Sequence, residues 1–171
     1  MATFTIRLAD PDDADMVQRI SAEAYVPAYH AIIGTVPKPA FEDYAPRIER
    51  GEVWLLDADG KPRGLVVLEA KTDHVLVYSV AVRPGDQGRG YGKALLAFAD
   101  RRAIALGLRE VRLYTNVRMK RNVDLYLSCG FAEVGTRPHP SRPGEVLVDM
   151  AKAPTYPEMD RTNPGSERSP D

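Results

Sequence analysis

Apolar and polar residues alternate over several short stretches of the chain, and this pattern predicts strands. Thr3–Leu8 alternates with a period of two, which is typical of a half-buried strand. Residues 52–56 and 63–70 predict two further strands around the turn DADGKP. The run VLVYSVAV within 74–83 is apolar on both faces, so we expect this strand in the middle of a sheet, covered on both sides.

Helical spacing separates these strands. Asp10-Pro11 predicts a helix start, because Asp caps the first turn and Pro lacks an amide hydrogen that would stay unpaired there. Residues 26–50 contain four prolines, which predicts a loop with short helices, 41–50 being the best helical stretch. A later helix is expected to run to about residue 106, with these core-facing residues: Leu95, Leu96, Ala99, Ala103 and Leu106.

The second half of the chain continues the alternation of strands and helices. Strands are expected at 111–115, 131–136 and 145–150, and a helix at 119–128. The order β-α-α-β-β-β-α-β-α-β-β predicts an α/β (α+β) fold in which a mixed sheet carries helices on both faces. Residues 154–171 are polar and rich in proline, so we expect a disordered tail.

Length, charge and cysteine content narrow the class of protein. The 171 residues suit one domain. With 23 basic and 24 acidic residues the net charge is −1, so we expect no nucleic-acid partner. The single Cys129 excludes an intramolecular disulfide and a cysteine-based metal cluster, and we expect no metal. The chain lacks a signal pattern and an apolar run of about 18 residues, so we expect a cytoplasmic protein without a membrane partner.

A glycine-rich turn after the long strand is the strongest chemical signal. Glycine occupies every second position from 88 to 92, where it lets the backbone bend and approach a ligand closely. The N–H groups of 87–93 would converge at the start of a helix, where unpaired amides and the helix dipole favour an anion. Arg89 and Lys93 add positive charge, so a diphosphate fits this turn.

Two other kinds of phosphate-binding loop do not fit the same residues. Gly85–Gly90 has the glycine spacing of a Walker loop, but Tyr91 stands where the lysine belongs. A dinucleotide fingerprint that starts at Gly88 would need its third glycine at Lys93, and it would have to follow the first strand of a βαβ unit.

The pattern that fits is Gln-Gly-x-Gly-x-Gly at 87–92 after a strand that ends in Val-x-Pro at 82–84. It resembles the acetyl-CoA loop of the GNAT family of N-acetyltransferases. The resemblance implies that acetyl-CoA is the cosubstrate, that the loop binds its diphosphate and that the preceding strand pairs with the pantetheine arm. The cofactor-binding residues so implied are Val80, Ala81, Val82, Gln87, Gly88, Arg89, Gly90, Tyr91, Gly92, Lys93, Asn116, Asn122 and Tyr126.

A second segment, 122–131, resembles the family's Asn…Leu-Tyr…Gly-Phe sequence. Asn122 and Tyr126 are four residues apart and therefore share one helix face, whereas Val123 and Leu127 are expected toward the core. In similar family members, a tyrosine at the position of Tyr126 is the general acid that protonates the departing thiolate, and an asparagine at the position of Asn122 holds the cofactor.

The resemblance covers residues 1–153, which it implies to be one GNAT domain with a mostly antiparallel sheet of six to seven strands. It also implies a homodimer. The expected activity is transfer of the acetyl group to a primary amine of a small molecule by direct attack in a ternary complex. Two alternatives stay open: a protein N-terminus or lysine as the acceptor, and a non-catalytic module that senses acyl-CoA.

The expected mechanism needs an oxyanion donor and a base. The backbone N–H of Val82 is the expected donor, because the strand would diverge from its neighbour there. Many family members place a glutamate at the position of Tyr78, so this chain leaves the base open. Glu69 ranks first because it lies at a strand end beside the cofactor strand. The alternatives are a water chain or one of Glu23, His30 and His74.

Aromatic residues are the candidates for the acceptor pocket. Tyr25, Tyr29 and Tyr78 are the substrate-binding candidates, and Tyr44 and Trp54 are further candidates for the lining of the pocket. Ordinary packing explains Tyr25, Tyr29, Tyr44 and Trp54 at least as well. The segment from Arg137 to Gly144 is expected to approach the acceptor site.

Overall fold

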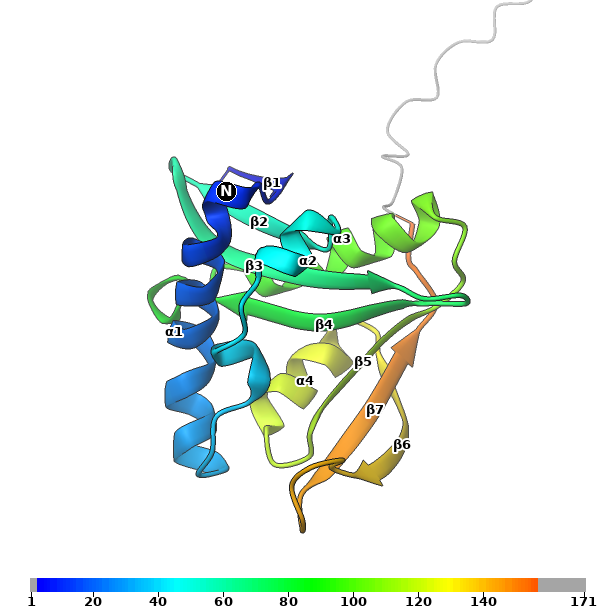
Figure 1. The fold of residues 1–171 in the computed structure, drawn as a ribbon. Helices are drawn as coiled ribbons and strands as arrows, with labels where there is room; N and C mark the ends of the chain where they lie inside the picture. The colour runs from blue at the N-terminus through cyan, green and yellow to red at the C-terminus, as the bar shows by residue number, and fades with distance from the viewer. Residues whose placement is uncertain (1–2, 157–171) are drawn as a thin grey trace, which may run out of the picture.

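Seven strands form one sheet with helices on both faces (Figure 1). The structure is a computed structural model that describes residues 3–156. The strands are β1 (Phe4–Leu8), β2 (Val53–Ala58), β3 (Lys61–Ala70), β4 (Val75–Val82), β5 (Val111–Asn116), β6 (Ala132–Pro138) and β7 (Val146–Lys152). The helices are α1 (Ala14–Ile32), α2 (Ala45–Glu49), α3 (Tyr91–Ala105) and α4 (Lys120–Ser128), and short 3₁₀ turns occupy Pro11–Asp13, Lys38–Ala40 and Pro84–Asp86.

The sheet order is β1-β2-β3-β4-β5-β7-β6, and every neighbouring pair is antiparallel except the parallel pair of β4 and β5. This confirms the predicted mixed, mostly antiparallel sheet with helices on both faces. It also confirms the prediction that the VLVYSVAV strand lies in mid-sheet, because β4 is the central strand of the seven. Its two apolar faces are needed there, since helices cover both sides.

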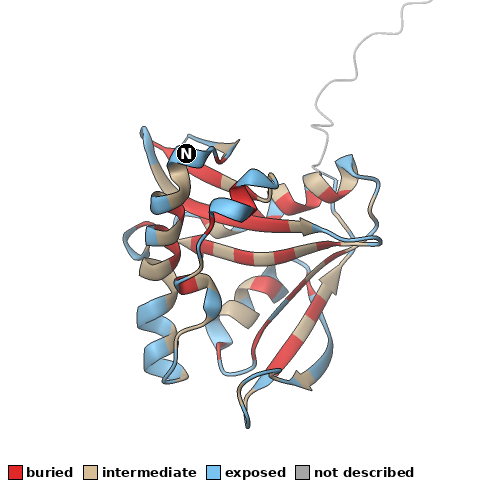
Figure 2. Cartoon of the chain, in the orientation of Figure 1, coloured by how far each residue is buried: buried red, intermediate tan, exposed pale blue. Residues whose placement is uncertain are grey.

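Each face of the sheet has its own apolar core (Figure 2). On one face, α1 and α2 pack on β2 and β3, with Ile20 and Leu55 fully buried. On the other face, α3 and α4 pack on β2 to β5 and β7, with Leu95 and Met150 fully buried. Alternate residues of β2 and β3 therefore enter different cores, which explains why both strands read as apolar runs.

The two halves of the sheet separate along β4. The parallel pairing of β4 with β5 covers only Val75 with Val111 and Leu76 with Arg112. Figure 1 shows β4 and β5 meeting at one end and diverging toward the other, with α4 on the side to which they open. The second half of β4, which leads to the glycine-rich turn, is therefore an open edge inside the fold.

A β-bulge sets the direction of the backbone groups on this open edge. Val67 and Leu68 of β3 are consecutive, but their partners on β4 are Ser79 and Val77, so Tyr78 is an extra residue. One extra residue reverses the side of the strand to which the following N–H and C=O groups point. The bulge thus decides which amides of Val80 to Val82 face the open edge.

The helix predicted from Asp10-Pro11 is longer than expected. Asp10 forms a capping box with Asp13, as a helix start requires, but α1 then runs to Ile32 and includes Pro27. The prediction of a loop from residue 26 was therefore wrong for its first seven residues. Proline removes one backbone hydrogen bond, and contacts of Tyr25 with the sheet on the preceding turn hold the helix in register.

Smaller differences concern the helix predicted at 41–50 and two leucines. The helix is shorter, Ala45–Glu49, because the Asp43 carboxylate accepts a hydrogen bond from the Ala45 N–H and ends the loop there. Leu106 and Leu127 were expected to face the core, but both are exposed. Leu106 follows the last turn of α3, and Leu127 lies on the outer face of α4. The helical periodicity in the sequence therefore assigned both residues to the wrong face.

The expected tail falls mostly outside the described residues, which end at Tyr156. Within them, Lys152 Nζ binds the Asp100 carboxylate at 2.5 Å and the Thr155 hydroxyl at 3.2 Å, which ties the end of β7 to α3. No helix in the range 3–156 combines the length and the hydropathy that crossing a membrane requires.

The two leucines at either end of α3 provide a test of the packing. Leu95 is 0% exposed and Leu106 is 47% exposed. Leu95→Ala should lower the free energy of unfolding by about 2–5 kcal/mol, because it leaves a cavity between α3 and the sheet. Leu106→Ala, the matched control, should change it by less than about 0.5 kcal/mol. Urea unfolding measures both, and equal effects would contradict the assignment of the two faces.

Candidate active site

The glycine-rich turn joins β4 to α3 through left-handed residues. Gly88 and Gly90 have φ angles of +80° and +84°. Residues with a side chain lose about 1–2 kcal/mol in this conformation, which explains glycine at both positions. Gly90 is the N-cap residue of α3. The start of a helix leaves its first N–H groups unpaired and carries the positive end of the dipole, an arrangement that favours a bound anion.

A cavity of about 660 Å³ lies against this turn, and we call it the loop cavity. It is bounded by α1, the end of β4, the turn, the start of α3 and α4. Lys93 and Arg121 bring positive charge to its wall. Asp86 is the acidic residue on the wall, and its buried carboxylate lies 3.4 Å from Arg63 and 3.6 Å from Arg89. The two arginines thus neutralise the charge of Asp86, and the remaining charges on the wall, those of Lys93 and Arg121, are positive.

A second cavity, also of about 660 Å³, lies on the other side of the same helices, and we call it the acceptor cavity. Residues 37–41, the edge of β4, the end of β5 and the segment between β6 and β7 bound it. The two cavities share five wall residues, which we call the junction: Tyr25, Tyr29, Val80, Asn122 and Tyr126. Two molecules could therefore meet over the second half of β4.

The open edge of β4 presents backbone groups to the junction. The Arg83 N–H donates to Arg63 on β3 at 2.9 Å, so the neighbouring Val82 points the other way, as does Val80. The Val82 carbonyl accepts from the Gln87 side-chain amide at 3.2 Å, and the Val80 carbonyl accepts from the Tyr25 hydroxyl at 3.1 Å. On the side of β4 away from β3, no described strand pairs with Val80 or Val82, so their N–H groups are turned toward the gap between β4 and β5.

Three of the five junction residues are tyrosines. Tyr25 and Tyr29 stack on one face of α1 with ring centroids 5.6 Å apart, and Tyr126 comes from α4. The Tyr25 hydroxyl also lies 2.8 Å from the Ser79 hydroxyl, which fixes its orientation. Burial raises the pKa of Tyr25 and of Tyr126 well above the usual value for tyrosine. The Tyr126 phenol therefore carries its proton at neutral pH.

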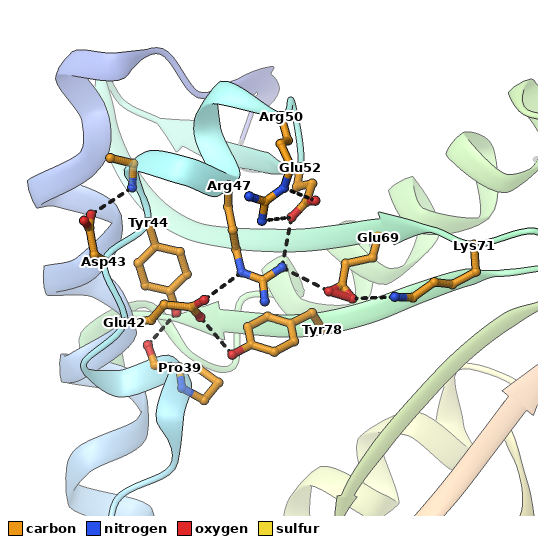
Figure 3. A network of polar contacts seen from close by, with 11 residues as sticks. Pro39, Glu42, Asp43, Tyr44, Arg47, Arg50, Glu52, Glu69, Lys71 and Tyr78 are labelled. Carbon is orange, nitrogen blue, oxygen red and sulfur yellow. Dashed lines mark hydrogen bonds and ion pairs between the residues drawn. The ribbon is translucent and has the colours of Figure 1, made fainter.

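A buried arginine organises the polar residues behind the acceptor cavity (Figure 3). Arg47 donates to Glu42 at 3.0 Å, to Glu52 at 2.9 Å and to Glu69 at 3.1 Å. Its guanidinium also lies 3.7 Å from the centroid of the Tyr78 ring. Figure 3 shows the Tyr78 hydroxyl turned toward Glu42, to which it donates at 2.8 Å. This network fixes the ring that forms one wall of the acceptor cavity.

Most residues with a predicted role line the cavities. Of the implied cofactor-binding residues, these line the loop cavity: Val80, Ala81, Val82, Gln87, Gly88, Gly90, Tyr91, Gly92, Lys93, Asn122 and Tyr126. Two others lie elsewhere: Arg89 turns away to pair with Asp86, and Asn116 lies on the acceptor cavity. Tyr25, Tyr29 and Tyr78 all line the acceptor cavity, as their predicted role requires.

Glu69, the first-ranked base, does not reach either cavity. One of its oxygens accepts from Arg47 and the other lies 3.2 Å from Lys71 Nζ, so both oxygens are engaged near the far end of β3. Tyr44 and Trp54 are packing residues: Tyr44 is buried against α1, and Trp54 packs on Phe98 with ring centroids 5.4 Å apart.

Sequence reasoning missed one cation on each wall, Arg121 and Lys38. Arg121 precedes Asn122 in the first turn of α4, and its neighbour was the one available signal. Lys38 belongs to the segment read only as a proline-rich loop. The segment Arg137–Gly144 does approach the acceptor cavity, to which it contributes Arg137, His139 and Arg142. Within residues 3–156 no group of three or more His, Cys, Asp or Glu residues could hold a metal ion.

Comparison with known proteins decides the family. Residues 16–131 match the family model described as the acetyltransferase (GNAT) family. The chain belongs to the GNAT family. Members of this family are acetyltransferases whose cosubstrate is acetyl-CoA, so the predicted family and the predicted cosubstrate are confirmed.

Relatives of this GNAT chain differ in length and acceptor. The chain is 32% identical over 134 residues to the mycothiol acetyltransferase of Streptomyces avermitilis. This match covers 75% of this chain and 42% of that protein. The chain thus spans less than half of that relative. The ribosomal-protein-S18-alanine N-acetyltransferase of Escherichia coli has the same fold, with a TM-score of 0.71 at 21% identity over 92% of this chain and 98% of the other. A putative acetyltransferase from Salmonella typhimurium, solved with its cofactor acetyl-CoA, gives 0.69 at 20% identity over 99% of each.

The buried tyrosines predict an unusual alkaline titration. Burial raises the pKa of five of the eight tyrosines, Tyr44 to about 12; the others are Tyr25, Tyr29, Tyr78 and Tyr126. A raised folded-state pKa favours the neutral form, so its contribution to stability is complete below about pH 10, where unfolded tyrosine titrates, and is lost above it. At pH 11, tyrosinate absorbance should be clearly lower in folded protein than in denaturant. Equal absorbance with an intact fold would contradict the burial of these hydroxyl groups.

The glycine turn predicts a charge-sensitive cofactor site. Gly90→Glu places bulk and negative charge at the loop cavity and should raise the Kd for coenzyme A by at least about tenfold, or about 1.4 kcal/mol. Gly90→Ala separates the backbone strain from the charge and should have a smaller effect. Gly85→Glu adds the same charge at an exposed position off the cavity wall and serves as control. Calorimetric titration measures all three, and wild-type affinity in folded Gly90→Glu would exclude this site.

Proposed function

We propose that this chain is an N-acetyltransferase that moves the acetyl group of acetyl-CoA to a primary amine of a small molecule, by direct attack while both are bound. One observation carries the proposal: the loop cavity and the acceptor cavity meet at the junction, beside the open edge of β4. Two molecules held there would react without a covalent enzyme intermediate, and positioning alone can lower the barrier by several kcal/mol.

In this mechanism the loop cavity holds the coenzyme with its diphosphate at the N-terminus of α3, near Lys93 and Arg121. The open edge of β4 offers amide groups to the pantetheine arm, and the N–H of Val82 stabilises the oxyanion that forms when the amine attacks the thioester. One such donor lowers a barrier by about 3–4 kcal/mol. Tyr126 then donates its phenolic proton to the departing thiolate, and the attacking nitrogen loses its extra proton to water.

The acceptor cavity supports a small molecule over a protein. Residues 36–41 and 137–145 bound it from two sides, and the Arg142 guanidinium joins them by donating to the Val36 carbonyl at 2.8 Å. A polypeptide acceptor needs a long open groove, whereas two wall segments joined by this hydrogen bond favour a compact ligand. The relatives are named for both kinds of acceptor, mycothiol and an alanine of ribosomal protein S18, so family membership by itself does not choose between them.

Tyr126→Phe tests the chemistry separately from binding. Loss of a general acid commonly costs about 100-fold or more in rate, so kcat for thiol release from acetyl-CoA with an active amine should fall by about that factor. The Kd for coenzyme A should stay within about threefold, since the ring still fills its place. Tyr156→Phe, at an exposed tyrosine that lines neither cavity, is the control and should keep wild-type kcat.

Three results would contradict the proposal. A broad panel of primary amines that releases no thiol, although coenzyme A binds, would favour the non-catalytic sensor. Turnover with peptides but with no small amine would favour a protein acceptor. Full activity in Tyr126→Phe would remove the assigned acid.

A further inference from the structure

The wall of the acceptor cavity carries an excess of positive charge. Three cationic side chains lie on it, Lys38, Arg137 and Arg142. Within residues 3–156, Glu145 is the single carboxylate on the same wall. Most of the remaining wall is aromatic, apolar or neutral polar, so the charge that a ligand meets there is positive.

The three cations come from segments that lie far apart in the sequence. Lys38 belongs to the 3₁₀ turn after α1, Arg137 to the end of β6, and Arg142 to the loop between β6 and β7. The hydrogen bond from Arg142 to Val36 holds these segments together on the side of the cavity away from the glycine-rich turn. Lys38, Arg137 and Arg142 line the acceptor cavity and not the loop cavity.

The local partners of these cations leave much of their donor capacity unused. The backbone carbonyl of Lys38 accepts from the Phe41 N–H, but its ammonium group has no ion pair and no hydrogen bond to another residue between 3 and 156. Arg137 uses only its Nε, which donates to both oxygens of Asp149 at 3.1 and 2.9 Å. Arg142 uses one terminal nitrogen for Val36, and the other lies 3.6 Å from Glu145, which is longer than a hydrogen bond.

Glu145 is poorly placed to receive a polycation. Its Oε2 lies 3.5 Å from the side-chain amide of Asn116 and 3.6 Å from Arg142, so the carboxylate already faces a donor and a positive charge. A site for a polyamine would need several free carboxylates. The described part of this cavity has the opposite balance.

On the basis of the function proposed above, we infer that the acceptor is a primary amine that also carries a compact anionic group, a carboxylate or a phosphate. Arg142 and Lys38 bind the anionic group, and the amine end reaches the junction beside Tyr126. The planar guanidinium of Arg142 matches either oxyanion with paired hydrogen bonds.

Matched acceptors test this inference. Four of the compounds share one carbon chain length and differ only in the group opposite the amine: an ω-amino acid, an aminoalkyl phosphate, an amino alcohol and a diamine. An α-amino acid and its amide complete the set. We expect kcat/KM for the better of the two anionic classes to exceed that of the alcohol, amide and diamine by at least about tenfold. The comparison of the acid with the phosphate identifies which oxyanion the site takes.

Two variants assign the preference to the cavity. Lys38→Gln removes a charge that holds no other residue, and Arg142→Gln removes the paired donor. Each should raise KM for the anionic acceptor, by about three- to tenfold, and leave kinetics with the amino alcohol unchanged. If loss of the bond to Val36 unfolds Arg142→Gln, Lys38→Gln still gives a result. Lys61→Gln, at the exposed first residue of β3, is the matched control and should change neither.

The outcomes separate this inference from the proposed function. Equal efficiency with all amines, or a preference for the diamine, would overturn the inference and leave the acetyltransferase activity in place. An anionic preference that Lys38→Gln and Arg142→Gln both leave intact would overturn the assigned residues. Absence of turnover with every amine would instead overturn the proposed function.

Discussion

The site of this protein depends on the separation of β4 from β5. The two strands pair at only two positions, and beyond Leu76 the edge of β4 has no neighbouring strand. An unpaired strand edge buried in a fold is costly unless its polar groups find partners. Here the cost has a use: the edge stays free for a ligand between α1 and α4, and two cavities meet over it.

The unpaired edge is kept in place by interactions that reach across the chain. The bulge at Tyr78 turns the amides of Val80 and Val82 toward the gap, and the Tyr25 hydroxyl partly satisfies the edge from α1. Arg47 holds Tyr78 from the opposite side together with three glutamates. Strand β4 is therefore held from α1 on one side and from the buried ion cluster of Arg47 on the other.

The two cavities differ in how their charge is built. At the loop cavity, the helix N-terminus and Lys93 come from the glycine-rich turn and the start of α3, and Arg121 is added from the start of α4, so most of the features that favour an anion lie within one turn. At the acceptor cavity, positive charge arrives from the turn after α1 and from the loop before β7, joined by the bond from Arg142 to Val36. A change in either distant segment would therefore alter the acceptor preference while leaving the cosubstrate site intact.

By itself, the sequence determined the order of the elements, the central position of β4, the glycine turn and the pairing of Asn122 with Tyr126, because each depends on periodicity or on spacing within about ten residues. Only the tertiary structure decided the rest. It decided that α1 continues through Pro27 and that Glu69 binds Arg47 instead of reaching a cavity. It also placed Asn116 on the acceptor cavity and brought Lys38 and Arg142 together there. These features depend on contacts between residues separated by 20 to more than 100 positions. Local patterns carry no information on such contacts, since burial and charge pairing are set by whichever segments the folded sheet brings together.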